Sequence, residues 1–387
     1  MPYAPCTREE FIPLLSAETI SLITLSLIDG VGSAIIQKLL GFFGSAEEVL
    51  AASYQELSQV MGLTPDLCRK IVDQRDKVPI SEELKLIEKH VCKVITIHDE
   101  AYPPGLQTIF DPPQILYVKG ELLPQDSMAI SIVGSRRATN YGKNVCDQLS
   151  RQLAVNGFTV VSGFARGIDS ISHRAALEAG GRTIAVMGNG LSFVYPAENA
   201  KLMEEIAGSG ACISEFPMSV PPMGTNFPRR NRVISGLSLG TLIIEASEKS
   251  GSLITARLAA EQGREVFAVP GEIFSKMSKG THNLIKQGAA LVETVEDIIS
   301  ALSLDTSRAS EAQAAPEIEK PPDVKLVDEE QTVWDALAHT PTHIDDIARL
   351  SELPPSKVSS ILVMLELKGI IQQLPGKMFA RKMAQRF

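Results

Sequence analysis

Three arginines follow one aromatic residue in the segment from Phe227 to Ser238, which reads FPRRNRVISGLS. The arginines are Arg229, Arg230 and Arg232, and they stand just before an apolar helical run. Guanidinium groups bind phosphate as planar, bidentate donors, and the face of an aromatic ring such as Phe227 can stack on a base. The segment therefore indicates chemistry with phosphates and bases, and we include Asn231, within the same run, among its candidate contacts.

The charge of the whole chain opposes such a partner. The 387 residues include 46 acidic side chains against 37 lysines and arginines, which gives a formal net charge of −9. A protein that coats nucleic acid nonspecifically is usually basic. Any binding of nucleic acid must therefore occur in a local basic cleft.

Two further arginine-bearing loops follow short apolar segments, in IVGSRR at 132–137 and VSGFARGID at 161–169. A strand, a glycine turn and a helix N-terminus form an anion site, because free backbone N–H groups and the helix dipole point the same way. The candidate contacts are Gly134, Ser135, Arg136, Ser162, Gly163, Arg166 and Gly167. The alternative is an ordinary pair of turns with exposed arginines. We expect Asp169 to cap the following helix, not to act as a catalytic carboxylate.

Catalytic groups are less evident. Glu245, before the loop EASEKSGSLITA, is the best candidate for an acid or base, with structural hydrogen bonding as the alternative. His173 is expected to be a helix-face histidine. The MGNG segment lacks the third glycine of a dinucleotide fingerprint, there is no GxxxxGK[ST] motif, and the five cysteines form no CxxC pair. We therefore predict no catalytic residue, no cofactor and no metal.

The candidate loops belong to an α/β pattern between residues 91 and 302, where apolar β-branched runs alternate with amphipathic, helix-length segments. This pattern predicts a parallel sheet covered on both faces. The expected strands are Val94–Ile97, Ile115–Val118, Ala129–Val133, Thr159–Val161, Thr183–Met187, Leu242–Ile244 and Val266–Val269. The expected helices are Tyr141–Asn156, Asp169–Ala179, Ala197–Ser209 and Ser252–Gln262. Glycines follow several strands, so the loops should meet at the carboxyl edge of the sheet, where open parallel sheets bind ligands.

Smaller domains flank this sheet. Residues 1–78 are expected to form an all-helical domain, in which Asp29-Gly30-Val31-Gly32 resembles the turn of a helix-hairpin-helix, with a packing turn as the alternative. Residues 79–302 would form the extended Rossmann-like domain, and the Ala-, Pro- and Glu-rich stretch 303–328 a linker. Residues 329–387 suggest a winged helix: helices at 332–338, 344–350 and 355–368, then a two-stranded hairpin at 370–374 and 378–380.

The apolar run at 11–28 is interrupted by Pro13 and Glu18, and no basic segment precedes an apolar block. This pattern favours a core helix over a signal peptide or membrane span. We expect a cytoplasmic protein with no membrane partner.

The ordered motifs IVGSRRAT, VSGFARGID, AVMGNG with the following Tyr195-Pro196, SEFP, FPRRNRVISGLS, EASEKSGSLITA and VPG resemble the DNA-processing protein A (DprA/Smf) family. The resemblance covers roughly residues 25–302, with a winged-helix tail as in many members. It implies a homodimeric protein that binds single-stranded DNA, protects incoming strands in natural transformation and loads the RecA recombinase. No catalytic activity is established for the family.

Carried over by motif, Arg136 and Arg166 would grip phosphates and Phe227 would stack on a base, with Asn231 and Arg232 supporting that loop. Some members carry a lysine shortly before the FP, and Met223-Gly224-Thr225-Asn226 has none here. That contact would be missing, or supplied by Arg229 or Arg230. Basic residues of the winged helix, Lys357, Lys368, Lys377, Arg381, Lys382 and Arg386, suggest duplex or partner binding. The alternative is a small dimerisation or inert domain.

Two other functions remain open from the sequence. Nucleotide phosphoribohydrolases, which have related Rossmann-like folds, use a glutamate with a PGGxGT-type loop. Glu245 and the EKSGSLITA loop occupy a comparable place, although the PGGxGT pattern is absent. A transcription factor would instead act through the winged helix and bind a specific duplex.

Overall fold

The computed structural model describes residues 15–302, 328–337, 342–368, 370–374 and 377–381. These residues form two compact units. The first contains the described residues up to 302 apart from 139–144, and the second contains the C-terminal domain. Nowhere in the described ranges is a helix both long and apolar enough to cross a membrane. Cys6 lies outside the described residues, and so does the expected linker except for Asp328, which begins a helix.

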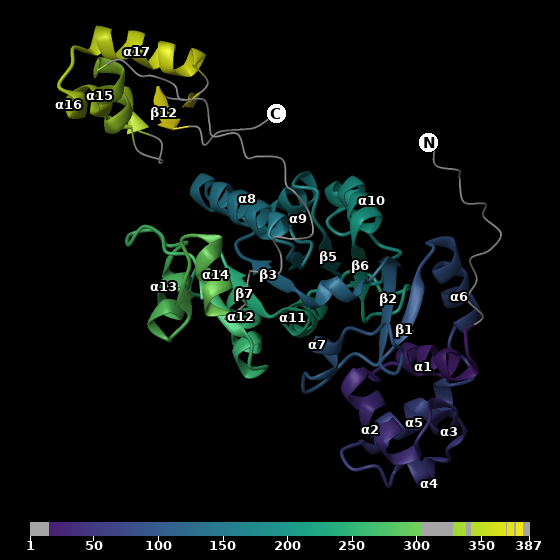
Figure 1. Ribbon diagram of the computed structural model, residues 1–387. Coiled ribbons are helices and arrows are strands. Elements are labelled where there is room, and N and C mark those ends of the chain that lie inside the picture. The colour runs from purple at the N-terminus through teal and green to yellow at the C-terminus, as the bar shows by residue number, and fades with distance from the viewer. Residues whose placement is uncertain (1–14, 303–327, 338–341, 369, 375–376, 382–387) are drawn as a thin grey trace. The chain divides into compact units, whose positions relative to one another are not determined.

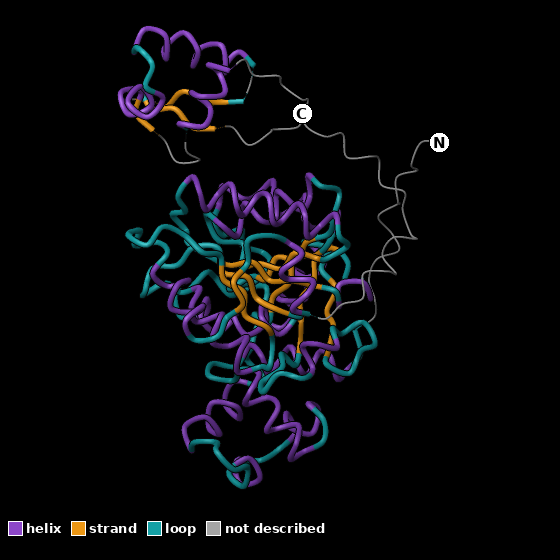
Figure 2. Tube along the Cα trace, turned by 60° about the vertical axis from the view of Figure 1, so that its left-hand side comes forward, coloured by secondary structure: helices purple, strands orange, loops and turns teal. Residues whose placement is uncertain are grey.

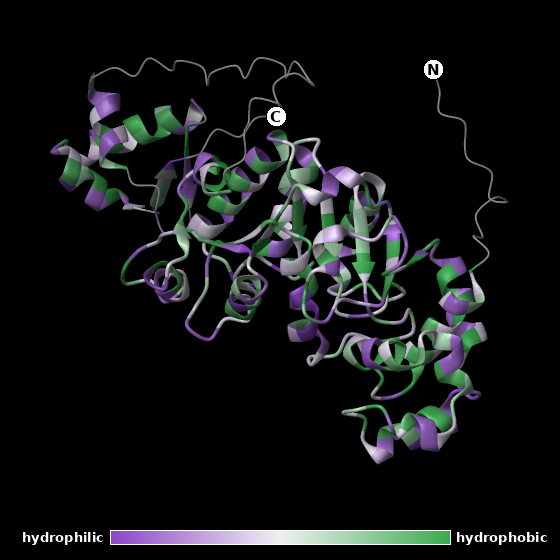
Figure 3. Cartoon of the chain, turned by 60° about the horizontal axis from the view of Figure 1, so that its bottom comes forward, coloured by the Kyte–Doolittle hydropathy of each residue, from purple (hydrophilic) through white to green (hydrophobic). Residues whose placement is uncertain are grey.

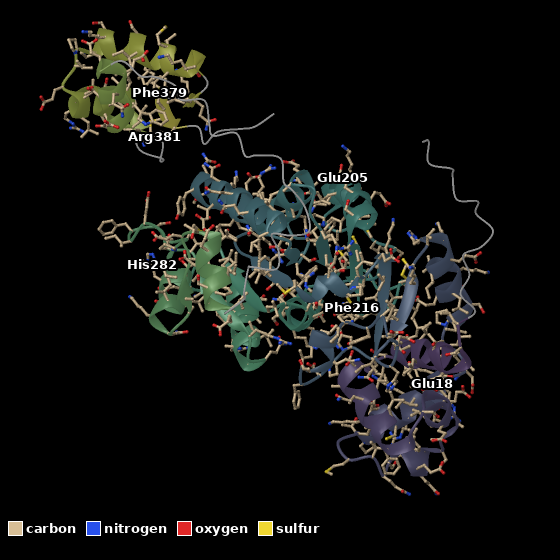
Figure 4. All side chains as sticks on the ribbon, viewed as in Figure 1. Glu18, Glu205, Phe216, His282, Phe379 and Arg381 are labelled. Carbon is tan, nitrogen blue, oxygen red and sulfur yellow. The ribbon has the colours of Figure 1, made fainter. Side chains whose placement is uncertain are left out.

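The N-terminal domain is helical, as expected (Figure 1). Its helices are α1 (Ala17–Leu27), α2 (Ser33–Phe43), α3 (Ala46–Ala51), α4 (Tyr54–Leu57) and α5 (Pro65–Gln74), and α6 (Ile80–Lys89) leads to the sheet. Several helices begin where the sequence supplies a cap: the hydroxyls of Ser16, Ser45 and Thr64 accept the N–H three residues on. Glu18, labelled in Figure 4, also accepts the backbone N–H of Ala46 at 2.7 Å.

The large domain is built on a nine-stranded sheet with the order β1-β2-β6-β5-β4-β3-β7-β8-β9. The strands β6, β5, β4, β3, β7, β8 and β9 run parallel to one another. At one end of the sheet, β2 pairs antiparallel with β6, and β1 pairs antiparallel with β2. The strands are β1 (Lys93–Thr96), β2 (Ile115–Gly120), β3 (Ala129–Val133), β4 (Thr159–Ser162), β5 (Thr183–Val186), β6 (Ala211–Ser214), β7 (Gly240–Ile243), β8 (Glu265–Ala268) and β9 (Ala290–Leu291). All seven predicted strands form, whereas β6 and β9 were not predicted.

Helices cover both faces of this sheet (Figure 2), and the strands that they cover are largely hydrophobic (Figure 3). They are α7 (Pro104–Gln107), α8 (Asn140–Val155), α9 (Ile168–Glu178), α10 (Ala200–Ser209), α11 (Asn226–Gly236), α12 (Ser252–Glu261), α13 (Lys279–Lys286) and α14 (Val295–Ala301). Alternate strand residues enter different cores: Val133 packs in the core with α11 and α12, and Ile132 packs with α8 and α14. The mostly parallel, doubly covered sheet confirms the Rossmann-like expectation.

The C-terminal unit is a winged helix with α15 (Asp328–Ala336), α16 (Ile344–Ser351) and α17 (Pro355–Leu367). Its sheet has the order β10-β12-β11, from β10 (Thr342–His343), β11 (Ile371–Leu374) and β12 (Met378–Arg381). The sequence predicted the two long strands and missed β10, which is only two residues long. Val333, Ile347 and Leu362 are central to its own buried core.

Several basic residues of the winged helix face partners within it. Lys368 Nζ lies 2.6 Å from the Glu330 carboxylate, and Lys357 pairs with Glu329. The Arg381 guanidinium lies over the Trp334 ring at 4.6 Å and donates to its carbonyl oxygen at 2.7 Å. Lys377 is exposed, and Lys382 and Arg386 lie outside the described residues. These contacts leave the expected role in duplex or partner binding untested.

Candidate nucleic-acid interface

A pocket of about 840 Å³ opens where the strands β3, β4 and β7 end. It lies within the large domain, between the first turns of α11 and α12 and the loop after β3. The candidate residues that line it are Gly134, Ser135, Arg136, Phe227, Arg230 and Asn231. Ser162, Gly163, Arg166, Gly167, Arg229 and Arg232 are not among its lining residues.

The loop after β3 and the loop after β4 touch one another. A Cβ atom on Gly167 would lie 2.3 Å from the Ser135 carbonyl oxygen, and the φ of Gly167 is +78°. Only glycine fits both conditions without displacing the backbone. The close approach sets Arg136 and Arg166 on neighbouring loops, as expected from the strand order. Ser135 is buried, and its hydroxyl accepts the Arg137 N–H at 3.0 Å.

Arg166 is exposed and forms a two-point ion pair with Glu198. Its Nη2 lies 3.0 Å from Glu198 Oε2, and its Nε contacts the other carboxylate oxygen. Hydrogen bonding from Arg166 lowers the pKa of Glu198 to about 2, so this carboxylate is ionised at neutral pH. Arg166 therefore already holds an oxyanion, in the planar geometry that suits phosphate.

Arg230 and Asp169 form the buried floor of the pocket. Arg230 Nη1 donates to the Gly163 carbonyl oxygen at 2.9 Å and also contacts the Val186 carbonyl oxygen. Burial lowers the pKa of Arg230 to about 10, although Asp169 partly opposes this shift, so the guanidinium stays charged. Burial raises the pKa of Asp169 to about 6, against the attraction of Arg230. A Cβ on Gly163 would contact both side chains, which explains why glycine stands there.

Arg232 is buried and supports the structure. Its Nε lies 2.8 Å from Asp111, and its Nη1 and Nη2 lie 2.6 and 2.7 Å from the two oxygens of Glu215. Burial alone would lower the pKa of Arg232, but the two carboxylates outweigh it and the pKa is raised. This arrangement agrees with loop support, while direct contact of Arg232 with DNA stays a prediction.

Arg229 is exposed and lies beside the helical domain. A Cβ on Gly32, at the start of α2, would lie 2.7 Å from Arg229 Nη2. The guanidinium also stands 5.8 Å from the centre of the Phe216 ring, which is labelled in Figure 4. Asn231, two residues further along the chain, lines the pocket and accepts from Arg230 Nε at 3.4 Å.

Phe227 lines the pocket beneath a guanidinium. Arg136 Cζ lies 5.8 Å from the centre of the Phe227 ring, and the Tyr195 ring is stacked on Phe227 with a centroid separation of 5.7 Å. The Phe227 ring also packs against the backbone of Gly188, where a Cβ would approach it to 2.6 Å. Sequence reasoning placed Tyr195 in a motif but not among the candidate contacts. The signal that could have found it is an aromatic residue in the loop after β5, at the same edge of the sheet.

The three side chains considered for catalysis are all buried. Glu245 is 3% exposed and does not line the pocket. His173 lies on α9 but is fully buried, with Nδ1 2.6 Å from the Thr183 hydroxyl, and burial lowers its pKa to about 3. Gly167, not Asp169, occupies the N-cap position of α9. Asp169 lies in the first turn instead, and its carboxylate accepts the Ala165 N–H at 3.3 Å.

The loop after β7 and the start of α12 bring serine residues and a helix N-terminus to the pocket. Ser250, Gly251 and Ser252 line it at the N-terminus of α12, where the N-cap glycine provides no side-chain bond. In the part of the chain that the structure describes, no three His, Cys, Asp or Glu side chains are grouped to hold a metal. The pocket thus combines two exposed arginines, Arg136 and Arg137, with two aromatic rings and a helix N-terminus, which suits a phosphate-bearing ligand.

Comparison with known proteins gives matches along most of the chain. A DNA recombination-mediator protein A family model matches residues 93–303, a SAM-like helix-hairpin-helix tandem matches 22–77, and a DprA winged helix domain matches 314–377. Protein Smf of Escherichia coli (strain K12) is 42% identical over 306 residues, covering 76% of this chain and 80% of that protein. Protein Smf of Synechocystis is 33% identical over 390 residues, covering 92% of this chain and 97% of its own length.

Two solved structures are also similar. The X-ray structure of DNA processing protein A from Streptococcus pneumoniae has a TM-score of 0.64 and 33% identity, covering 74% of this chain and 98% of that one. A structure of DNA processing protein A from Helicobacter pylori, which concerns its single-stranded DNA binding mode, has a TM-score of 0.50 and 33% identity. It covers 55% of this chain and 97% of its own.

Proposed function

Because the chain belongs to the DNA recombination-mediator protein A family, we propose that its pocket binds single-stranded DNA. The observation that carries the proposal is the Arg136 guanidinium over the Phe227 ring, in a pocket that also receives the N-terminus of α12. A cationic group beside an aromatic face suits a nucleotide, because the phosphate and the base are then bound by adjacent groups. The base is available only where the strand is unpaired.

The phosphate contacts in this proposal come from two arginines on neighbouring loops. Arg136 lines the pocket, and Arg166 stands on the adjoining loop in its ion pair with Glu198. Gly134, Ser135 and the loop 162–167 hold these arginines in place. Arg229 and Arg230 would add positive charge, with Arg230 acting from beneath because its side chain is buried. Asn231 and Arg232 complete the wall formed by α11.

The wider role in this proposal follows the family. The bound strand would be protected as incoming DNA in natural transformation and delivered to the RecA recombinase, and the protein would act as a homodimer in the cytoplasm without catalysing a reaction itself. The division into 1–78, 79–302, 303–328 and 329–387 is proposed as the modular basis of this role, with DNA binding assigned to the second module.

Glu198 competes with DNA for Arg166 in this scheme. A phosphate that reaches Arg166 must displace a carboxylate which already makes two contacts with the same guanidinium. Glu198→Gln removes the negative charge while keeping nearly the same shape. We therefore expect Glu198→Gln to tighten binding and Arg166→Ala to weaken it. If Arg166 and Glu198 take no part in binding, neither variant will change the affinity for DNA.

The test is the binding of a labelled thymidine oligonucleotide at several salt concentrations, measured by fluorescence anisotropy. Each lost phosphate contact should reduce the slope of log affinity against log salt by about 0.7 for a single strand. Arg136→Ala and Arg166→Ala should each show this change, with affinity lowered roughly tenfold. Arg151→Ala is the matched control, because Arg151, like Arg166, is held in ion pairs, here with Asp147 and Glu178, but it lies on α8 and does not line the pocket. Unchanged, salt-insensitive binding by the first two variants would refute the site.

A further inference from the structure

We propose that Tyr195 and Phe227 form a two-ring platform that receives two consecutive bases of the strand. This inference rests on the proposed binding of single-stranded DNA and adds a second aromatic contact to it. Tyr195 lies in the loop after β5, while Phe227 lies in the first turn of α11. Both rings line the same pocket.

The two rings differ in how firmly they are held. Phe227 is half-buried and packs against the backbone of Gly188. Tyr195 is 45% exposed and stacks on Phe227 with an angle of 25° between the ring planes. A centroid separation of 5.7 Å belongs to offset stacking, in which each ring keeps part of its face uncovered. Each ring therefore has its own surface on which a base can lie.

The platform also has an arginine beside it. The Arg136 guanidinium stands 5.8 Å from the centre of the Phe227 ring, and Arg136 lines the same pocket. One ring and one arginine match one nucleotide, with the base on the ring and the phosphate on the guanidinium. The Tyr195 ring adds a place for the next base.

The platform favours a single strand. A base that lies on one of the rings gives up its stacking on a neighbouring base at that face, because the ring takes the place of the neighbour. Unstacking costs less in a single strand than in a duplex. The preference does not require reading the base sequence, since every base has a face that can stack.

Phe193 supplies a matched control for Tyr195. It is an aromatic residue of the same loop, it is 38% exposed, and it does not line the pocket. Its backbone carbonyl oxygen accepts from Asn189 Nδ2 at 2.8 Å, a contact that Phe193→Ala preserves. The two alanine variants thus remove similar exposed rings from one loop, and only one of the rings belongs to the platform.

The experiment is an abasic scan with the full-length protein. The shortest thymidine oligonucleotide that the wild type binds is made with one abasic site, which is moved along the strand. Affinities are measured for the wild type, Tyr195→Ala, Tyr195→Phe, Phe227→Ala and Phe193→Ala. For the wild type, abasic sites at two neighbouring positions should weaken binding by roughly fivefold to a hundredfold each.

The variants identify which ring takes which base. Tyr195→Ala should weaken binding of the intact strand and become insensitive to one of the two abasic positions, and Phe227→Ala should become insensitive to the other. Tyr195→Phe and Phe193→Ala should behave like the wild type. Equal weakening on every oligonucleotide, or full sensitivity at both positions in Tyr195→Ala, would overturn the platform while leaving the proposed function standing. A wild type that binds no oligonucleotide would remove the proposed function itself.

Discussion

The three arginines of the segment FPRRNR have different environments, although the residue type is the same at each position. Arg229 is exposed beside Gly32, Arg230 is buried under the pocket, and Arg232 is held by two carboxylates. Asp111, which binds Arg232, is 121 residues away along the chain. The sequence could predict an arginine-rich wall, because residue type and strand order are local. It could not predict burial, which depends on distant residues that pack against each arginine.

The pocket floor should make DNA binding dependent on pH. Asp169 lines the pocket, and its pKa of about 6 means that it is ionised at pH 7.5 and mostly neutral at pH 5.5. Acidification removes a negative charge beside Arg230, so affinity for a thymidine oligonucleotide should rise as the pH falls through this range at constant ionic strength. Asp169→Asn should bind more tightly at pH 7.5 and respond less to pH. The measurement is anisotropy across the pH series for both proteins.

Thymine and the phosphodiester groups do not titrate between pH 5.5 and 7.5, so the oligonucleotide does not contribute to the change. The expected sign is a negative slope of log affinity against pH in the wild type. If Asp169→Asn keeps the same slope, groups other than Asp169 cause the dependence, and this assignment fails.

At the scale of elements, the sequence predicted the strands that have a strong apolar pattern. The segment Ala129–Val133 matches β3 exactly as bounded, because it is a buried apolar run ended by glycine. The short strands β6 and β9 lack such a signal, since β6 is the four residues ACIS and β9 has only two. The sequence also did not predict the two antiparallel pairings of the sheet, β1 with β2 and β2 with β6. The apolar content of a strand does not encode its direction.

The contact between the loops after β3 and β4 should depend on Gly167. In Gly167→Ala the new Cβ would lie 2.3 Å from the Ser135 carbonyl oxygen, at a φ of +78°. Gly180 is the matched control, because its φ is +74° and nothing lies within 4 Å of a Cβ there. We expect Gly180→Ala to cost about 1 kcal/mol and Gly167→Ala roughly 2–3 kcal/mol or more.

Urea unfolding followed by far-UV circular dichroism measures both variants. Tryptophan fluorescence would follow the wrong unit, because the single tryptophan, Trp334, belongs to the winged helix. Similar losses in the two variants would show that the backbone conformation, and not the loop contact, determines the cost.

At the scale of the whole molecule, the helical domain and the sheet domain form one unit. The buried Glu83 carboxylate on α6 accepts the backbone N–H groups of Met218 and, at 3.1 Å, Ser219. Ser33 of α2 donates to Glu215 at 3.0 Å, and Glu215 in turn binds Arg232. The position of α11 thus depends on the helical domain through this chain of contacts. The helical and α/β patterns predicted both domains, but not these contacts between them.

The winged helix should be dispensable for binding a short single strand. Every residue that lines the pocket lies between Val133 and Met277. A variant that ends at Leu302 should therefore bind the shortest thymidine oligonucleotide with the affinity of the full chain, within about twofold. The measurement is a side-by-side titration of the two proteins by anisotropy. A tenfold loss would assign DNA contacts to the winged helix and restore the duplex-binding hypothesis for its basic residues.

Because β2 pairs with β6, which comes much later in the chain, β2 must wait for this partner during synthesis. Gly120 pairs with Ala211, so one edge of β2 has no partner until the ribosome has made the intervening chain. At about 5–20 residues per second this takes roughly 5 to 20 seconds. An unpaired strand edge is a template for association with other chains. We therefore expect the nascent protein to be most prone to aggregation, and most dependent on chaperones, in the interval before β6 emerges.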